Sequence, residues 1–468
     1  MSPSVSTPTV SQRIETSVAD VALSIATKRE TAPDSSEIRY YARSFGDPLS
    51  RLFWHEQELH LGIMPPHGQK FRKLAESDIF DSLVADRLIF GLSQASVYSE
   101  VFDRSYRLDH TPRITYWHEW SPRMLRAAAL RLLKLCIKLA RLDLTLRNPH
   151  PWNLLFDGQQ FSYANAGSIM PFDFDTFGRS YEKIARYFVR PLLLVEHGYE
   201  HTAQRLLQDI REGTLAKDID HLNCSWSEWD QKRWHGNALA FLEKVSEHLQ
   251  TLNPEPTANR WIDYFATDCD FGPGTSWSRK QEALLLMLQD GNIRSVLDLG
   301  ANIGHYAKLA VDHERQVMAV DFDPGLVDAI YEGTLSSRLP IYSAVMDFTH
   351  PTPGDGVDYQ WLPPATERYS ADLVLCFALA HHMVFGKYRL DFEQIARGVR
   401  SFSRSWALVE YVERGKIQPA EWRPDAESWY SVDTFADVLR RHFRFVEVLP
   451  PAVDGRRLLV CGPERRHL

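Results

Sequence analysis

The sequence has few cysteines and no cysteine pattern. Its 468 residues include five cysteines, and neither a CxxC pair nor a Cys/His cluster with zinc spacing occurs. An odd number of widely spaced cysteines favours a reducing compartment. The five are Cys136, Cys224, Cys269, Cys376 and Cys461. We therefore expect neither a disulfide framework nor a metal site.

Long apolar runs and an excess of basic residues are also missing. No stretch of about 18 apolar residues occurs, which a membrane-spanning helix would require. The first residues show neither the basic nor the apolar segment of a secretory signal. There are 53 Lys and Arg against 61 Asp and Glu, and this net charge of −8 disfavours a protein that coats nucleic acid. We therefore expect a cytoplasmic protein without membrane or nucleic-acid partners.

What the sequence does contain is enough for more than one domain. At roughly 100–200 residues per domain the length corresponds to about two to four domains. Apolar residues make up 44% and aromatic residues 12%, as in folded soluble proteins. The predicted parts are a flexible tail over 1–35, an α+β domain over 36–250, a linker and lead-in to a cofactor site over 251–278, and an α/β domain over 279–468.

The last of these parts alternates helices with short apolar strands. The expected strands are 295–299, 317–321, 341–345, 372–377 and 406–411, followed by a closing antiparallel pair at 445–449 and 458–461. The expected helices are 280–288, 305–311, 392–402 and 432–442. This alternation predicts an α/β fold with a mostly parallel sheet of seven strands and helices on both faces. Ligands of such sheets bind outside the carboxyl ends of the strands.

A glycine-containing loop follows the first of these strands. Asp298 lies near the strand end, and Gly300, Asn302 and Gly304 follow at every second position. A dinucleotide fingerprint counted from Gly300 would require glycine at 302 and 305, where Asn302 and His305 stand. The pattern therefore suits a ligand without a pyrophosphate. The glycines let the backbone approach that ligand closely, and the acid can complement a positive group on it.

Acids and aromatic residues follow the next two strands. Asp321 and Phe322 come about 20 residues after Gly300, where a carboxylate can accept two hydrogen bonds from a ribose diol. Asp347 and Phe348 follow the third strand. They offer an acceptor for an amino group of a base and an aromatic ring beside that base. The three segments together predict a site for a nucleoside-containing ligand.

Candidate catalytic residues follow the fourth and fifth strands. The fourth strand ends in Phe377, and His381 and His382 follow in what we expect to be a strand-to-helix loop with the two rings pointing in different directions. Either ring can take a proton from a hydroxyl or ammonium group, and a structural role is the alternative for each. Glu410, at the end of the fifth strand, is expected to face the same cleft. It either binds the acceptor or pairs with a nearby arginine.

These four segments, in this order, resemble those of class I S-adenosylmethionine-dependent methyltransferases. The resemblance covers about 280–462, and four motifs at successive strand ends are far more specific than one. It implies a Rossmann-like methyltransferase domain over 279–468 and S-adenosyl-L-methionine as the cofactor. It also implies that Gly300 and Gly304 line the methionine part of the cofactor. The cofactor-binding candidates are Asp298, Gly300, Asn302, Gly304, Asp321, Phe322, Asp347, Phe348 and Phe377.

The first half contains a second pattern. It resembles the catalytic region of aminoglycoside phosphotransferase-type kinases, which carry D-x-H-P-x-N followed by D-x-G. The matching residues are His150, Pro151, Asn153 and Gly167. Both acids of that pattern are replaced here, by Asn148 and Asn165. An amide cannot act as a base and holds Mg²⁺ poorly, so the resemblance implies an inactive kinase-like half.

The whole arrangement also resembles nodulation-type methyltransferases, which join such an N-terminal region to a class I domain. This resemblance extends from about residue 51 to the end. The alternative for the first half is that its Asn-Pro and His-Pro pairs only make turns and caps. If the half has a role, we expect it to shape the acceptor site, to cover the cleft or to mediate contacts in a homo-oligomer.

Three functions remain open on the sequence alone. The first is methyl transfer from S-adenosylmethionine to an oxygen or nitrogen of a small-molecule acceptor, a specialised metabolite or a saccharide. The second is a non-catalytic binding or regulatory protein built from degenerate kinase-like and methyltransferase-like modules. The third is a kinase that acts through the first half. Binding of the methyl donor or its demethylated product separates the first from the second.

Overall fold

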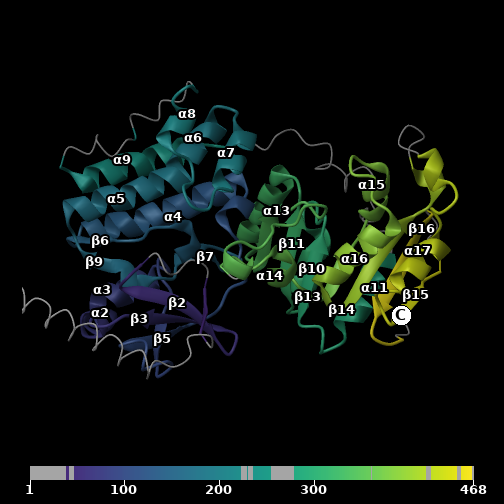
Figure 1. Ribbon diagram of the computed structural model, residues 1–468, viewed down its shortest axis with the longest axis horizontal. Helices are drawn as coiled ribbons and strands as arrows, with labels where there is room; N and C mark the ends of the chain where they lie inside the picture. Colours follow the sequence, from purple (N-terminus) through teal and green to yellow (C-terminus); the bar gives the residue numbers. More distant parts are fainter. Residues whose placement is uncertain are drawn as a thin grey trace, which may run out of the picture.

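The structure is a computed structural model that describes residues 38–41, 47–222, 229, 236–254, 279–359, 361–417, 423–450 and 455–465. The tail predicted over 1–35 and most of the linker predicted over 251–278 lie outside these residues, as do Cys224 and Cys269. Figure 1 shows the two halves side by side, with the first half in purple to teal and the second in green to yellow. In the described part of the chain, no helix is both long enough and apolar enough to cross a membrane.

The first half begins with a small antiparallel sheet. Its strand order is β1-β2-β3-β5-β4, and the strands are β1 (Arg39–Tyr40), β2 (Ser50–His55), β3 (Glu58–Ile63), β4 (Leu92–Ala95) and β5 (Arg104–Leu108). Two helices, α2 (Gly68–Ala75) and α3 (Asp78–Ala85), connect β3 to β4. One face of this sheet packs against the core through buried side chains such as Leu52, Leu59 and Leu61.

A helical layer completes the first half. The long helix α4 (Pro122–Ala140) starts at a proline, whose fixed φ suits the first helical turn, and buries its apolar stripe. Two short antiparallel pairs follow, β6 (Leu144–Leu146) with β9 (Ile169–Pro171) and β7 (Leu154–Phe156) with β8 (Phe161–Tyr163). The remaining elements are α5 (Phe174–Ile184), a π-helical turn (Ala185–Val189), α6 (Arg190–Glu196), α7 (Glu200–Leu207), α8 (Ala216–Ile219) and α9 (Ala238–Thr251). The α+β character predicted for this half is present.

The second half contains the sheet of seven strands that the sequence predicts. The order is β12-β11-β10-β13-β14-β16-β15, and β10 to β14 are parallel while β16 is antiparallel to β14 and β15. The strands are β10 (Ser295–Leu299), β11 (Gln316–Asp321), β12 (Ile341–Val345), β13 (Ala371–Cys376), β14 (Ser403–Val412), β15 (Phe445–Val448) and β16 (Arg456–Gly462). The predicted closing antiparallel pair is therefore confirmed.

Helices pack on both faces of this sheet. They are α11 (Arg279–Leu288), α12 (His305–Val311), α13 (Pro324–Ser337), α14 (Ala365–Arg368), α15 (Ala380–Phe385), α16 (Phe392–Phe402) and α17 (Val432–Leu439). Alternate residues of β10 enter different apolar clusters: Val296 packs with α11 and α12, and Leu297 belongs to the cluster that contains α16 and α17. Three of the helices, α13, α14 and α15, were not predicted from the sequence.

The strand order reverses beside β10. From β10 the chain proceeds to β11 and β12 on one side, and β13 then returns to the other side of β10. Such a reversal leaves a crevice at the carboxyl ends of the two central strands, which is where α/β sheets of this kind bind ligands. The glycine loop after β10 lies at this crevice.

A buried ion pair joins the two halves. Glu119 and Arg368 have side chains only 1% and 5% exposed, and the guanidinium Nη1 donates to Glu119 Oε2 over 3.0 Å. The Tyr369 hydroxyl donates to the same carboxylate. Burial alone would raise the pKa of Glu119, but the Arg368 charge and hydrogen bonds lower it to about 2. The contact ties α14 of the second half to the segment before α4.

Candidate functional site

A cavity of about 620 Å³ lies at the carboxyl ends of the central strands of the seven-stranded sheet. Ligand pockets for small molecules are typically about 300–1,000 Å³, so one cofactor-sized molecule fits. Eight of the nine cofactor-binding candidates line the cavity, namely Asp298, Gly300, Asn302, Asp321, Phe322, Asp347, Phe348 and Phe377. Segments far apart in the sequence are thus brought to one place by the parallel strands.

Asp321 lies at the end of β11 and is 4% exposed. Its Oδ2 accepts a hydrogen bond from the Asn302 backbone N–H over 2.9 Å, and its Oδ1 accepts one from the Asp323 N–H over 3.1 Å. Burial raises the pKa of Asp321 to about 6, although these hydrogen bonds act in the opposite direction. Each carboxylate oxygen has a second lone pair, so the group can still accept two hydrogen bonds from a diol.

Asp298 is the second buried acid of the cavity. It is 2% exposed, and its Oδ2 has no hydrogen-bond partner among the described residues. Burial, and then the neighbouring Asp321 carboxylate, raise the pKa of Asp298 to about 7. Two neighbouring buried acids with raised pKa values favour a ligand that carries positive charge.

The loop after β10 is held in a left-handed conformation. The φ angles of Gly300, Asn302 and Gly304 are +68°, +52° and +76°. Asparagine is one of the few side chains that tolerates this region, which explains why it can stand between the two glycines. Gly304 precedes α12 and faces Ile330, where an added Cβ would lie 3.2 Å away, and it does not line the cavity. The predicted contact of Gly304 with the methionine part is therefore not supported.

Asp347 and Phe348 follow β12 and also line the cavity. Asp347 Oδ1 accepts hydrogen bonds from the Thr349 backbone N–H and hydroxyl over 2.8 and 2.7 Å, which orients the carboxylate. The Phe348 ring lies against Gly398, where any Cβ would collide with it. Phe322, by contrast, is 59% exposed at the rim.

The two histidines differ from the prediction. They lie on the short helix α15 rather than in a loop, and their ring centroids are 3.9 Å apart, so the rings lie against each other. His382 lines the cavity and His381 does not. Burial, followed by the charge of His382, lowers the pKa of His381 to about 2, so His381 stays neutral near pH 7. Of the two histidines, only His382 therefore borders the cavity.

Glu410 lies behind the cavity wall rather than at its mouth. It is 1% exposed, its carboxylate pairs with Lys280 and with Arg456 over 3.2 Å each, and it accepts a hydrogen bond from the Ala378 N–H. It does not line the cavity. Of the two roles expected for it, the geometry therefore favours the arginine pair.

Lys280 lines the cavity but was not singled out from the sequence. It is 9% exposed on α11, and its Nζ lies 5.8 Å from the ring centroid of Tyr306 and 5.9 Å from that of Phe377. It precedes the buried Ala283 and Leu284 by three and four residues, so it shares their helix face. A lysine on the apolar face of the helix that leads into a ligand loop is the signal that could have found it.

The replaced acids of the first half are buried and hydrogen-bonded. Asn148 Oδ1 accepts from Lys183 Nζ over 2.7 Å, and Asn165 Oδ1 accepts from Ser50 Oγ over 2.6 Å. The two asparagines are 2% and 1% exposed. In the part of the chain that the structure covers, no three His, Cys, Asp or Glu residues are grouped so that they could hold a metal ion. The Mg²⁺ ligands of a kinase are therefore not reproduced at these positions.

Comparison with known proteins gives one relative over nearly the full length. No family model matches the chain. It is 23% identical over 454 residues to nodulation protein NoeA of Rhizobium meliloti (strain 1021), and the alignment covers 86% of this chain and 92% of that one. The chain resembles a nodulation protein. The resemblance to nodulation-type proteins that the sequence predicts is thereby confirmed.

Solved structures resemble parts of the chain at low scores. A co-crystal structure of WbdD with a kinase inhibitor has a TM-score of 0.32 at 10% identity, and the match covers 47% of this chain and 48%, about half, of WbdD. A TehB-like SAM-dependent methyltransferase from Corynebacterium glutamicum has a TM-score of 0.28 at 15% identity, covering 44% of this chain and 95% of that one. These scores are too low to assign an activity, so the function is argued from the site.

Proposed function

We propose that the protein is a methyltransferase that uses S-adenosyl-L-methionine and acts on an oxygen or nitrogen atom of a small-molecule acceptor, such as a specialised metabolite or a saccharide. The observation that carries this proposal is the cavity at the reversal of the strand order. Its walls combine a buried acid with one oxygen that lacks a partner among the described residues, an acid suited to a diol, and an acid beside an aromatic ring.

Each of these groups has a counterpart in the cofactor. Asp298 faces a cationic group, because its unpartnered oxygen and raised pKa are relieved by positive charge. Asp321 binds the ribose diol, since both of its oxygens are fixed by backbone N–H groups and each can accept a further bond. Asp347 and Phe348 receive the adenine, through its amino group and its ring face.

When bound, S-adenosyl-L-methionine would supply a methyl group on a positively charged sulfur, and that sulfur would be left as a neutral thioether once the methyl group is transferred. The protein must hold the acceptor atom on the far side of that carbon, and positioning of this kind can account for much of the acceleration. An acceptor hydroxyl or ammonium group also loses a proton. We assign its removal to His382, which lines the cavity, with His381 as the neutral ring packed against it.

Phosphoryl transfer is not part of the proposal. The positions of a kinase base and a metal ligand hold Asn148 and Asn165, whose amide oxygens are engaged by Lys183 and Ser50. An amide neither takes the acceptor proton nor replaces a carboxylate at Mg²⁺.

Isothermal calorimetry of the full chain tests the proposal. S-adenosylmethionine and S-adenosylhomocysteine should both bind, and Asp321→Asn should weaken both by about tenfold or more, because an amide presents one acceptor instead of two. Asp312→Asn, at an exposed position after α12, is the matched control and should leave binding unchanged. No binding of either ligand to the wild-type chain would instead favour the non-catalytic module.

A labelling experiment can identify the acceptor directly. A metabolite extract is incubated with the full chain and a methyl-labelled cofactor, and the small molecules are then analysed by mass spectrometry. The proposal predicts a labelled small molecule that is missing when His382→Ala replaces the wild type. Label that appears only in protein or nucleic acid would contradict the assignment to a small-molecule acceptor.

A further inference from the structure

A second cavity, of about 490 Å³, lies in the first half over the replaced kinase acid Asn148. Its walls carry the cationic side chains of Arg179, Lys183, Arg186 and Arg211, and Glu182 is the one acid among its described lining residues. These groups come from α5, from the π-helical turn after it and from the segment that follows α7. The balance of charge is therefore opposite to that of the cofactor cavity.

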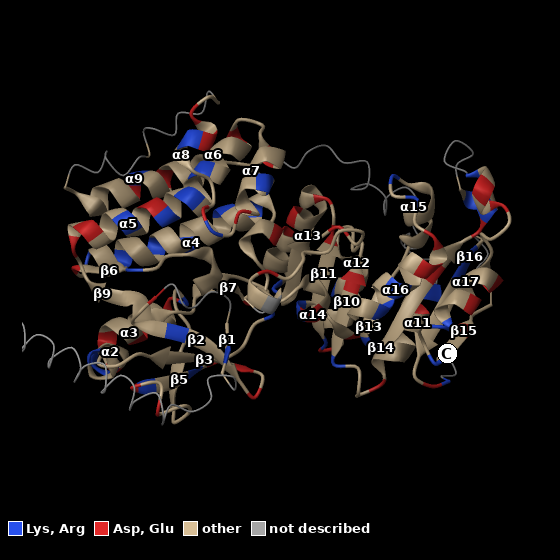
Figure 2. Ribbon diagram, in the orientation of Figure 1, with Lys and Arg blue, Asp and Glu red and all other residues tan. Residues whose placement is uncertain are grey.

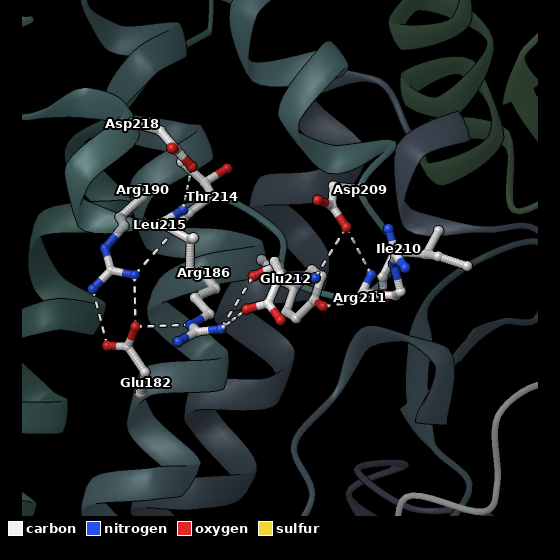
Figure 3. A network of polar contacts seen from close by, with 11 residues as sticks. Glu182, Arg186, Arg190, Asp209, Ile210, Arg211, Glu212, Thr214, Leu215 and Asp218 are labelled. Atoms are coloured by element: carbon white, nitrogen blue, oxygen red, sulfur yellow. Dashed lines mark hydrogen bonds and ion pairs between the residues drawn. The ribbon is translucent and has the colours of Figure 1, made fainter.

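The negative charge of Glu182 is already paired with an arginine that lies outside the cavity, Arg190. Figure 3 shows Glu182 between Arg190 and Arg186. Arg190, which does not line the cavity, donates from its two terminal nitrogens to the two Glu182 oxygens over 2.9 Å each. Arg186 Nε donates to Oε1 over 2.9 Å, and its Nη1 reaches Glu212 over 2.8 Å. Lys183 and the arginines at the other walls therefore give the cavity a positive excess.

The orientation of the Asn148 amide is set by Lys183. A lysine ammonium can only donate, so the amide oxygen must face it, and it does so over 2.7 Å. The amide Nδ2 then points the other way. It is buried, and it has no hydrogen-bond partner among the residues that the structure describes. The indole Nε1 of Trp152, a residue 9% exposed on the same cavity, is likewise buried without a described partner.

Buried N–H donors and cationic groups around one cavity can bind the same kind of ligand. Both kinds of group are satisfied by an anion with several acceptor oxygens, and charge-assisted hydrogen bonds to such an anion are the stronger ones. An aspartate at 148 would repel an anion, whereas the asparagine donates to it. We propose that this cavity binds a phosphate group directly, without a metal ion. The kinase-like half would then be a receptor for phosphate rather than an enzyme that transfers it.

The position of the cavity indicates what the phosphate belongs to. Ile210 and Arg211 also line a larger cavity of about 1000 Å³ between the two halves. That cavity in turn shares Phe322, Met346 and Asp347 with the cofactor cavity. The three cavities adjoin one after another, with methyl donor and phosphate at opposite ends. If the proposed function holds, the phosphate is part of the methyl acceptor, which spans the middle cavity.

Calorimetry with the full chain in EDTA tests the phosphate site. Inorganic phosphate is the first probe and phenyl phosphate the second. We expect wild-type binding, a loss of tenfold or more in Asn148→Asp, and a loss of a few fold in Trp152→Phe, which removes one N–H and keeps the aromatic ring. Asn292→Asp, at an exposed position of the second half, makes the same chemical change and should bind like the wild type. Tighter binding of phenyl phosphate identifies an ester as the ligand, and tighter binding of inorganic phosphate identifies the free ion.

Three results would overturn the phosphate site: no binding of either probe to the wild type, binding that appears only when Mg²⁺ is added, or equal binding by the wild type and the two site variants. The test is independent of the methyltransferase assignment, because Asn148→Asp should leave the affinity for S-adenosylmethionine unchanged. Should Asn148→Asp fail to fold, Trp152→Phe alone decides, since an unchanged affinity in that variant contradicts the proposal.

Discussion

The two halves of the molecule each hold a cavity near chain segments that resemble catalytic motifs, but acids outnumber lysines and arginines around the cavity of the second half, and the reverse holds around that of the first. The cavity of the second half keeps three acids, Asp298, Asp321 and Asp347, and two of them are buried with raised pKa values. The cavity of the first half has an amide where its motif calls for an acid, and cations around it. The acidic cavity suits a cation with hydroxyl groups, and the basic one suits an anion.

Charged residues of both signs are present along the chain in both halves. Figure 2 shows Lys and Arg interspersed with Asp and Glu along the helices of both halves. The difference in charge between the halves is therefore found in the two cavities, where few charged groups are present and each is partly or fully removed from water. A single change from acid to amide at such a place alters what the site can bind, whereas the same change at an exposed position has little effect.

The largest expected effect is on the stability that the buried ion pair between the two halves contributes. Glu119→Gln removes the charge that neutralises the buried Arg368, and breaking such a pair should cost about 3–5 kcal/mol of unfolding free energy. Denaturant titration measures it. Glu367, which pairs with Arg39 at an exposed position, provides the control, because Glu367→Gln should cost less than about 1 kcal/mol. Equal stability of the two variants would show that the halves do not depend on the buried contact.

The next effect separates the two histidines of α15. His382→Ala should lower turnover about 100-fold or more, as expected for loss of a general base, and change the affinity for the cofactor less than about threefold. Steady-state rates and calorimetry measure the two quantities. His381→Ala is the comparison, because its ring is neutral and does not line the cavity. Turnover that depends on His381 and not on His382 would reverse the assignment.

A smaller effect follows from the raised pKa values of the acidic cavity. In the free protein Asp298 and Asp321 have pKa values of about 7 and about 6, so they bind protons at mildly acid pH. A cationic ligand stabilises the charged form of these two carboxyl groups. Binding therefore lowers their pKa values and releases the bound protons. Affinity for S-adenosylmethionine should therefore rise roughly tenfold from pH 5.5 to pH 7.5, since each pKa unit corresponds to a tenfold change.

Calorimetry in buffers of different ionisation enthalpy can follow that proton release directly. Asp298→Asn should flatten the dependence between pH 6 and pH 7.5, because it removes the group with the higher pKa. Affinity that falls as the pH rises across this window would show that the acids do not face the positive charge.

Much of the second half could be predicted because its strands are buried apolar runs. The strand predicted over 295–299 and the strand predicted over 341–345 coincide with β10 and β12, and the acids after β10, β11 and β12 meet as expected. Three helices, α13, α14 and α15, were missed. The Asp323-Pro324 pair follows β11 and marks a helix start: Asp323 caps α13 by accepting from the Gly325 N–H over 2.8 Å, and Pro324 is the first helical residue.

The remaining errors concern side chains that meet only in three dimensions. Glu410 could not be assigned because Arg456 reaches it from β16, which pairs with β14 in an antiparallel register that no local pattern reveals. The arrangement of charge around Asn148 was equally hidden, since Lys183 and Arg211 come from segments far along the chain. Local motifs predicted most of the residues that meet at the cavity of the second half, but not the burial and ion pairs around them.

A crystal of the full chain soaked with S-adenosylhomocysteine tests the central claim most directly. The account predicts the adenosyl group in the cavity at the ends of β10 and β11, with both ribose hydroxyls within hydrogen-bond distance of the Asp321 carboxylate and the adenine beside Phe348. Density for the ligand elsewhere, or a filled cavity in which Asp321 does not contact the diol, would contradict it.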